Sequence, residues 1–388
     1  MLQVSNKPQI WILSKYVMRN NDAPQLATEY PAPDELQDIE ETIAFLKTKM
    51  EAAYEPNAIR RDAHPKHHGI IRAEFIIEAD LPEALQVGVF KQGLSRPKRS
   101  FPAWIRLSNA SNRVHADSEK DMIGFAIKLM GVEGEKLLNL KDESYFKDAL
   151  TIASSFTEEK YTQDFLFMSH PVFLAARIKD FKNLIMAAFG PKSIIKFFFN
   201  PFDSHLRTLW IALTMNKHHS SPLDNRYWSN SAYLFGQDEQ GNKRAVKYAL
   251  IPTSNLRSTI PKEKSENYLK DAMITHLAKE DASFDFMIQF QTDAKKMPIE
   301  DITIDWPEKL SPLIKVASIK IPKQTFDSKA QMDFAENSYF SAWHSLPEHR
   351  PLGSINRARR FAYDQLSKFR LQRNKLPRLE PKGDEDFS

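Results

Sequence analysis

The sequence predicts an α+β fold built around one central antiparallel β-barrel. Short apolar runs separated by turn residues recur at 70–78, 103–108, 124–130, 150–154, 164–168, 245–252, 284–291 and 316–321. Runs of this length and spacing are typical of antiparallel strands in a sheet or barrel. Apolar residues recur instead at helical spacing at about 36–50, 174–199, 264–279 and 354–374. We therefore expect a single barrel with helices around it.

The chain divides into three expected parts. Residues 1–55 form an N-terminal extension, which has a proline-containing polar linker at 20–34 and then a helix. Residues 56–376 form one domain, with a helical insertion at about 172–217, because no convincing boundary interrupts them. Residues 377–388 include the polar sequence PKGDEDFS and are expected to be disordered.

Composition excludes several classes of function. The chain of 388 residues has no cysteine, which rules out disulfides and thiolate metal sites and fits a reducing cytoplasm. The formal net charge of +4 is small and is not gathered in a basic stripe, so we expect no nucleic-acid partner. No uncharged apolar run reaches about 18 residues, and we predict no membrane-spanning helix.

The first candidate site is a histidine-rich segment directly before the first predicted strand. His64, His67 and His68 fall within five residues, and Arg61 precedes them. The segment could be a solvated polar loop, supply a catalytic histidine, or ligate a metal directly. Zinc is disfavoured, because partners at the usual zinc-ligand spacing are missing nearby.

The second candidate site is the strand at 103–108. Arg106 and Ser108 lie two residues apart, so both side chains point to the same face of this strand. An exposed polar strand face is the alternative interpretation.

The third candidate site is the C-terminal helix. Arg359, Tyr363 and Arg370 are spaced four and seven residues apart and share one face of the helix. A guanidinium held against a phenol favours the ionised phenolate, which is a hard anionic ligand suited to ferric iron. A surface helix with an Arg–Tyr pair would show the same spacing.

The order of these segments resembles that of the catalase-like haem proteins. Arg61-x-x-His64-x-Lys66 resembles the distal-histidine motif of that superfamily, and IRLSN, which contains Ser108, resembles its Val-Arg-Phe-Ser strand. DMIGFAIKL resembles Arg-Gly-Phe-Ala-Val-Lys-Phe, and His-Pro-Val-Phe resembles Thr-Pro-Val-Phe-Phe. Arg359-x-x-x-Tyr363 resembles the proximal motif. The resemblance covers residues 61–370.

Some longer stretches are similar to particular branches of the superfamily. PEHRPLGSINRARR, NRYWSNSAYLFG and AVKYALIP look like the small bacterial catalase-related proteins and the allene oxide synthase branch. The resemblance implies a catalase-like antiparallel β-barrel surrounded by helices. It also implies a haem b buried between the barrel and the C-terminal helix.

The resemblance further assigns roles to individual residues. It implies that Tyr363 ligates the haem iron, as tyrosine does in catalases, with Arg359 beside it. Arg61, Arg106 and Arg370 would bind the haem propionates, a task that suits the bidentate guanidinium. His64 would transfer the proton of a bound peroxide, and Ser108 would hold its imidazole.

The sequence also departs from the catalase pattern. Catalases carry an asparagine just before the Thr-Pro-Val-Phe segment, where this chain has Met168 and Ser169. Ser169 is the nearest polar candidate to replace it, and Ile123 replaces the arginine of Arg-Gly-Phe-Ala. We therefore expect weak catalase activity together with peroxidase activity on hydrogen peroxide or on organic or lipid hydroperoxides. The electron donor is unidentified.

Two other functions stay open at this point. The chain could be a fatty-acid hydroperoxide isomerase or lyase like the allene oxide synthases, or a haem-binding protein with little turnover. Residues 172–200 combine apolar clusters with five cations, at Arg177, Lys179, Lys182, Lys192 and Lys196. Such a segment could contact a membrane surface or pack on the barrel with its lysines in water. The sequence leaves open whether the chain is a homo-oligomer.

Overall fold

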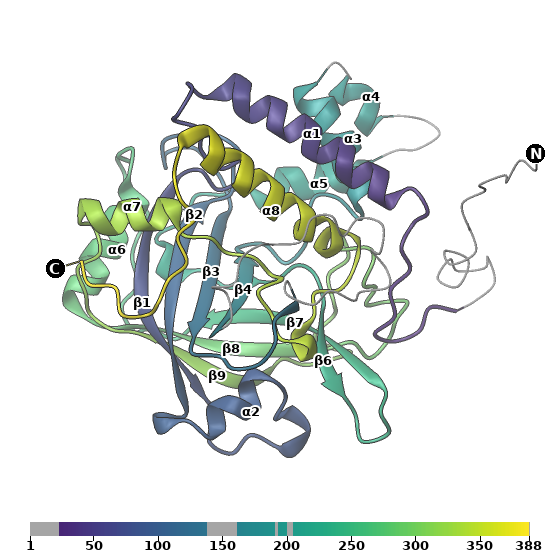
Figure 1. Ribbon diagram of the computed structural model, residues 1–388, viewed down its shortest axis with the longest axis vertical. Helices are drawn as coiled ribbons and strands as arrows, with labels where there is room; N and C mark the ends of the chain where they lie inside the picture. The colour runs from purple at the N-terminus through teal and green to yellow at the C-terminus, as the bar shows by residue number, and fades with distance from the viewer. Residues whose placement is uncertain (1–22, 138–160, 191–192, 200–204, 388) are drawn as a thin grey trace, which may run out of the picture.

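The computed structural model describes residues 23–137, 161–190, 193–199 and 205–387 (Figure 1). The predicted strand at 150–154 lies outside these residues. Within them the chain forms nine β-strands, which are β1 (His67–Ile77), β2 (Ser100–Asn109), β3 (Ile123–Met130), β4 (Thr162–Met168), β5 (Tyr227–Trp228), β6 (Tyr233–Gln237), β7 (Lys243–Pro252), β8 (Ala282–Phe290) and β9 (Ile314–Ile321). The predictions named all of these strands except β5 and β6.

Eight of the strands close into an antiparallel barrel. They are hydrogen-bonded in the order β5-β4-β3-β2-β1-β9-β8-β7, and β5 also pairs with β7, which closes the ring. β6 extends the sheet from β7 outside the ring. The expected α+β barrel fold is therefore confirmed. Closure gives each of these eight strands hydrogen-bonded neighbours on both sides, so none of the eight is an edge strand.

Large apolar side chains fill the barrel. Phe75, Phe165 and Phe286 contact one another, with ring centroids 5.0 to 6.2 Å apart. These rings belong to a cluster of buried residues contributed by every strand of the ring. The interior is packed with aromatic and branched side chains. A binding site on the barrel is therefore expected on its outer face.

Eight helices lie outside the barrel in the described part of the chain. They are α1 (Glu35–Ala53), α2 (Val89–Leu94), α3 (Ile178–Phe189), α4 (Ile194–Phe198), α5 (Leu206–Met215), α6 (Tyr268–Lys279), α7 (Lys329–Asn337) and α8 (Ser354–Asn374). The helix predicted at 174–199 is in fact the two helices α3 and α4. α5 lies within the helical insertion predicted at about 172–217, and α2 and α7 were not predicted. None of the described helices is long and apolar enough to cross a membrane.

The helices at the two ends of the chain lie side by side. In Figure 1, α8 runs across the upper end of the barrel, and α1 packs along α8 and α3. Ile39 and Ile43 of α1 share an apolar cluster with Ile355 and Phe361 of α8. The N-terminal helix therefore supports the C-terminal one.

Two segments predicted to lack fixed structure make specific contacts. Glu29 lies in the predicted linker, yet it forms ion pairs with Arg350 and with Arg357 of α8. In the predicted disordered tail, Glu385 accepts a hydrogen bond from the Trp104 indole at 3.0 Å, and the Phe387 ring packs against that indole. Neither set of contacts could be predicted from the sequence, because the partners lie more than 280 residues apart in the chain.

Candidate active site

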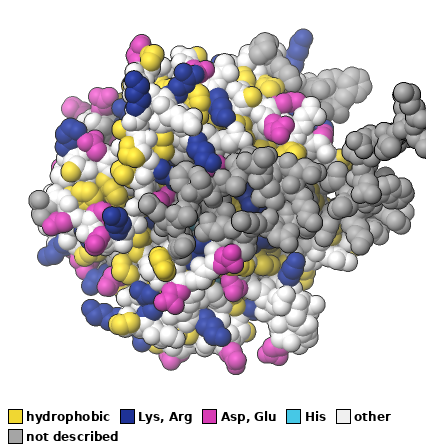
Figure 2. Space-filling view, viewed as in Figure 1, with side chains coloured by type: hydrophobic (Ala, Val, Ile, Leu, Met, Phe, Trp, Pro, Cys, Tyr) yellow, Lys and Arg dark blue, Asp and Glu magenta, His cyan; other side chains and the backbone are white. Residues whose placement is uncertain are grey.

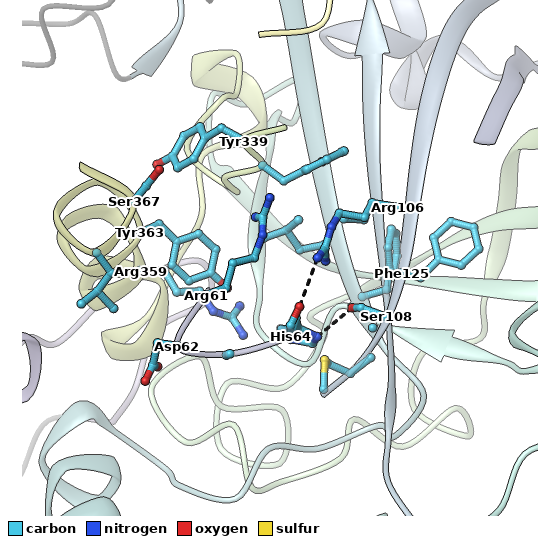
Figure 3. Close-up of a pocket in the computed structure, with 18 of the residues that line it drawn as sticks. Arg61, Asp62, His64, Arg106, Ser108, Phe125, Tyr339, Arg359, Tyr363 and Ser367 are labelled. Carbon is cyan, nitrogen blue, oxygen red and sulfur yellow. Dashed lines mark hydrogen bonds between the residues drawn. The ribbon is translucent and has the colours of Figure 1, made fainter. Parts of the chain in front are cut away.

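A cavity lies between the outer face of β2–β4 and helix α8. Its empty volume is about 1020 Å³, part of which opens to solvent. It is lined by residues from the barrel, from α8 and from the loops between them, including Met50, Arg61, Asp62, Ala63, His64, Arg106, Ser108, Gly124, Ala126, Leu166, Met168, Asn230, Tyr339, Phe340, Arg359, Tyr363, Leu366, Ser367 and Arg370. The cavity therefore brings together every predicted site residue except Ser169. Figure 3 shows α8 on one side and the barrel strands on the other.

The barrel side of the cavity holds His64 in a defined orientation. Its Nδ1 lies 3.0 Å from the Ser108 hydroxyl, and its carbonyl accepts a hydrogen bond from Arg106 at 3.1 Å (Figure 3). Strand register explains the contact, because β1 begins at His67, opposite Ser108 of β2. A left-handed backbone at His64, with φ of 61°, turns the ring back toward Ser108.

Gly124 makes room for the imidazole. It pairs with Ser108 across β2 and β3. A Cβ at this position would lie 2.6 Å from two ring atoms of His64 and 3.1 Å from the Ser108 hydroxyl. The ring thus occupies the space where any other residue would place its side chain.

Burial keeps His64 neutral. Removal from water, reinforced by the nearby Arg106 cation, lowers the pKa of His64 from 6.5 to about 4. The ring is therefore uncharged at neutral pH, and Nδ1 is the nitrogen engaged by Ser108. When Nδ1–H donates to the Ser108 hydroxyl, Nε2 of the neutral ring carries a lone pair and can accept a proton.

The other two histidines of the segment do not line the cavity. His68 Nε2 lies 2.8 Å from the Asn109 side-chain oxygen, and His67 lies 3.7 Å from Glu336. Within the described residues, no cluster of three or more His, Cys, Asp or Glu side chains is placed to hold a metal ion. The expected alternative of direct metal ligation by this segment therefore finds no support in the described part of the chain.

The helix side of the cavity is built from one face of α8. Arg359, Tyr363, Leu366, Ser367 and Arg370 line the cavity at helical spacing. Arg359 donates to Ser231 at 3.2 Å and to Asn356 at 3.1 Å. In the described chain neither Arg359 nor another side chain hydrogen-bonds the Tyr363 hydroxyl.

A buried ion cluster holds the start of α8. Arg357 is 2% exposed and donates to Glu29, Glu35 and Glu300 at 2.6 to 3.1 Å. The helix begins after Gly353, which has φ of 91° and whose added Cβ would lie 2.6 Å from the Ile299 carbonyl oxygen. These contacts from three distant segments fix where Tyr363 lies.

Three arginines meet at one edge of the cavity. Arg106 and Arg370 are 5% and 3% exposed, and Arg61 donates to the carbonyls of Glu336 and Ser338. Among the described residues, Glu336 is the carboxylate that forms an ion pair with this group, 3.4 Å from Arg370. Burial lowers the pKa values of all three guanidinium groups, and the nearby Arg61 cation lowers those of Arg106 and Arg370 further, the latter to about 10. The edge therefore carries an excess of two positive charges, three guanidinium groups against one carboxylate.

Two solved structures similar to this chain are catalases. A fungal catalase superimposes with a TM-score of 0.59 and 19% identity over 91% of this chain. A bacterial catalase superimposes with a TM-score of 0.57 and 16% identity over 92% of this chain. The chain has the catalase-like fold. It spans 66% of the length of the fungal catalase and 64% of the bacterial one.

The comparisons support this assignment at the level of the fold. No known protein-family profile and no curated protein sequence matches the chain. The predicted catalase-like barrel is thus confirmed, while the expected similarity to the allene oxide synthase branch is not shown.

The residue predicted to replace the catalase asparagine is not in the cavity. Ser169 accepts a hydrogen bond from the Ile123 amide at 2.9 Å and so connects the ends of β3 and β4. Met168, one residue earlier on β4, lines the cavity instead. The prediction for Ser169 fails because neighbouring strand residues point to opposite faces of the sheet.

The structure adds an asparagine that sequence reasoning missed. Asn230 is 1% exposed and lines the cavity from the segment between β5 and β6. Its amide donates to the His170 carbonyl at 2.6 Å, and its side-chain oxygen is buried without a hydrogen-bond partner. Its left-handed φ of 58° suits asparagine. In the sequence, the segment Ser229-Asn230-Ser231 indicated only a local turn and not a place in the cavity.

Proposed function

We propose that the chain is a haem-dependent enzyme that acts on peroxides, as a peroxidase with weak catalase activity. The observation that carries the proposal is the pair of opposed cavity walls. A neutral, oriented histidine stands on the barrel side, and a tyrosine hydroxyl without a partner among the described residues stands on the helix side.

The arginine edge fits haem b. The excess of two positive charges there matches the pair of propionate carboxylates on this cofactor. Arg61 Nε is buried without a hydrogen-bond partner, which leaves a donor for such a carboxylate. Arg61, Arg106 and Arg370 would therefore hold the propionates, and Tyr363 would supply the iron ligand, the role of tyrosine in catalases.

The roles of the protein residues follow from their surroundings. Bound haem iron would supply the redox chemistry that breaks the O–O bond of a peroxide. His64 Nε2 would take the peroxide proton and return it to the departing oxygen, while Ser108 keeps Nδ1 engaged. Arg359 precedes Tyr363 by one helical turn on the cavity face of α8 and would lie beside the iron ligand.

The substrate is best matched by an organic hydroperoxide. Met168 lines the cavity, and Ala126, Leu166, Phe340 and Leu366 add apolar surface to it. Methionine donates no hydrogen bond to a small peroxide but tolerates a hydrocarbon chain. Product analysis separates a peroxidase, which needs an electron donor, from an isomerase, which does not.

The test is the absorption spectrum of haem-loaded protein. We expect a high-spin, tyrosinate-type spectrum that is lost in Tyr363→Phe together with most haem retention. The control is Tyr339→Phe, which removes a hydroxyl from the same cavity but from outside α8. An unchanged spectrum in Tyr363→Phe would refute the proposal.

A further inference from the structure

Two adjoining helices expose apolar side chains where the surface of a protein is normally polar. On α5, Leu206, Trp210 and Leu213 are 51%, 64% and 73% exposed. On α4 and directly after it, Ile195 and Phe199 are 68% and 61% exposed. We call these five residues the α4–α5 surface. Large exposed apolar side chains gathered in this way mark contact sites for other molecules.

The exposed residues of α5 belong to a helix that is held in place by packing on its other face. Its opposite face is buried, with Ile211 and Met215 packed against Met122 and Val172. The exposed residues lie four and three positions apart, so they form a single stripe. The helix is therefore apolar on both faces, and its packing on the barrel leaves the second face without a protein partner among the described residues.

Contacts between the two helices keep their exposed residues close. His205, just before α5, stacks on the Phe197 ring of α4 with centroids 4.0 Å apart. Its amide also donates to the Phe198 carbonyl at 3.3 Å. The exposed ends of the two helices therefore belong to one region at the upper right of the ribbon in Figure 1.

The exposed charged side chains on α4 and α5 are cations, and Asp180 of α3 is a carboxylate nearby, 4.0 Å from His205. Lys196 of α4, Arg207 of α5 and Lys217 beyond α5 are exposed, and no described carboxylate forms an ion pair with any of them. On the face in Figure 2, cationic and anionic side chains of the described residues are interspersed. A region that is apolar and cationic together matches an anionic lipid surface.

We propose that the α4–α5 surface docks this protein on the surface of an anionic lipid bilayer. The apolar stripe of α5 would lie among the lipid headgroups and upper acyl chains, and Lys196 and Arg207 would contact lipid phosphates. A second copy of the chain fits less well, because a two-fold interface would place these cations against themselves. The inference goes beyond the proposed function and does not depend on haem.

The experiment measures co-sedimentation of the full chain with lipid vesicles. We expect binding to vesicles of phosphatidylglycerol and phosphatidylcholine, and little binding to phosphatidylcholine alone. Trp210→Ser with Leu213→Ser should weaken vesicle binding about tenfold or more, because these side chains supply apolar area. Lys196→Glu with Arg207→Glu should abolish the preference for the anionic lipid.

Matched controls exclude a general effect of surface changes. Ile260→Ser and Leu310→Ser alter side chains that are 47% and 40% exposed in other parts of the surface, and both should bind vesicles like the parent chain. Quenching of tryptophan fluorescence by brominated lipid should fall in Trp210→Phe. Thermal unfolding of each variant shows that it remains folded.

Three outcomes would overturn the proposal. The first is vesicle binding that is absent, or that the α5 variants leave unchanged. The second is a dimer that the α5 variants dissociate, which would make the surface a self-interface. The third is a Trp210 already protected from aqueous quencher in the free monomer, which would show that another part of the chain covers it.

Discussion

The two walls of the cavity are held in place in different ways. On the barrel side, His64, Ser108 and Gly124 are positioned by neighbouring strands, and the imidazole is hydrogen-bonded and neutral. On the helix side, no described side chain hydrogen-bonds the Tyr363 hydroxyl. The position of Tyr363 depends on the ion pairs of Arg357 that anchor α8. The barrel wall is thus set by local register, and the helix wall by contacts from distant segments.

The largest expected effect concerns the barrel wall. His64→Ala should slow the reaction of the haem-loaded protein with peroxide by about 10²- to 10⁴-fold, because it removes the group that transfers the proton. The haem spectrum should stay close to that of the parent, because the helix wall is intact. His68→Ala is the control, since His68 contacts Asn109 outside the cavity. Stopped-flow absorbance gives both rates, and a slow His68 variant with a fast His64 variant would contradict the assignment.

A change in the ion cluster should affect the helix wall through stability. Arg357→Ala leaves Glu35 and Glu300 buried without this cation and leaves Glu29 with Arg350 alone. Loss of one partner from a buried ion pair typically costs about 3–5 kcal/mol. We expect a loss of that size in the free energy of unfolding, measured with denaturant, together with weaker haem retention. Arg373→Ala removes an exposed pair with Glu51 and should cost at most about 1 kcal/mol.

Met168→Asn adds a hydrogen-bond donor to the barrel side of the cavity and should increase the difference between the two cavity walls. One well-placed donor at a developing negative charge is worth about 10²- to 10³-fold in rate. Because the new amide would not be supported by evolved neighbours, we expect a gain of about tenfold in oxygen evolution from hydrogen peroxide. Leu166→Asn adds the same group two residues earlier on β4 and should give no gain. An equal response to both changes would mean that polarity alone matters.

The smallest expected effect is that of pH on the peroxide reaction near neutrality. The pKa of His64 is about 4, so the ring stays neutral and the rate should be flat above about pH 5. The rate should fall as pH drops through the folded-state pKa. The free energy of unfolding depends on pH over a wider range than the rate. In the unfolded chain His64 takes up a proton near pH 6.5, whereas in the folded chain it does so only near pH 4. The contribution of His64 is therefore complete above pH 6.5 and is lost progressively down to about pH 4. A steep rate change between pH 6 and 8 would assign the proton transfer to another group.

The sequence by itself determined the elements that depend on local periodicity. Alternation over 103–108 placed Arg106 and Ser108 on one strand face, and helical spacing placed Arg359 and Tyr363 on one helix face. These inferences agree with the structure because side-chain direction within an element repeats with a fixed period. The strands of the barrel were recognisable for the same reason, except for β5, whose two residues are too few to show a period. β6, which lies outside the ring, was also missed.

Only the tertiary structure decided which distant residues meet. The cavity combines α8 with β2–β4, and residues 23–34 supply Glu29 to an arginine more than 300 positions away. The tertiary structure also places Met168 in the cavity and Ser169 outside it, and it adds Asn230 from the segment before β6. Pairing of this kind depends on strand register and on packing across the whole fold. No local pattern encodes it, because the groups that satisfy each buried polar atom come from anywhere in the chain.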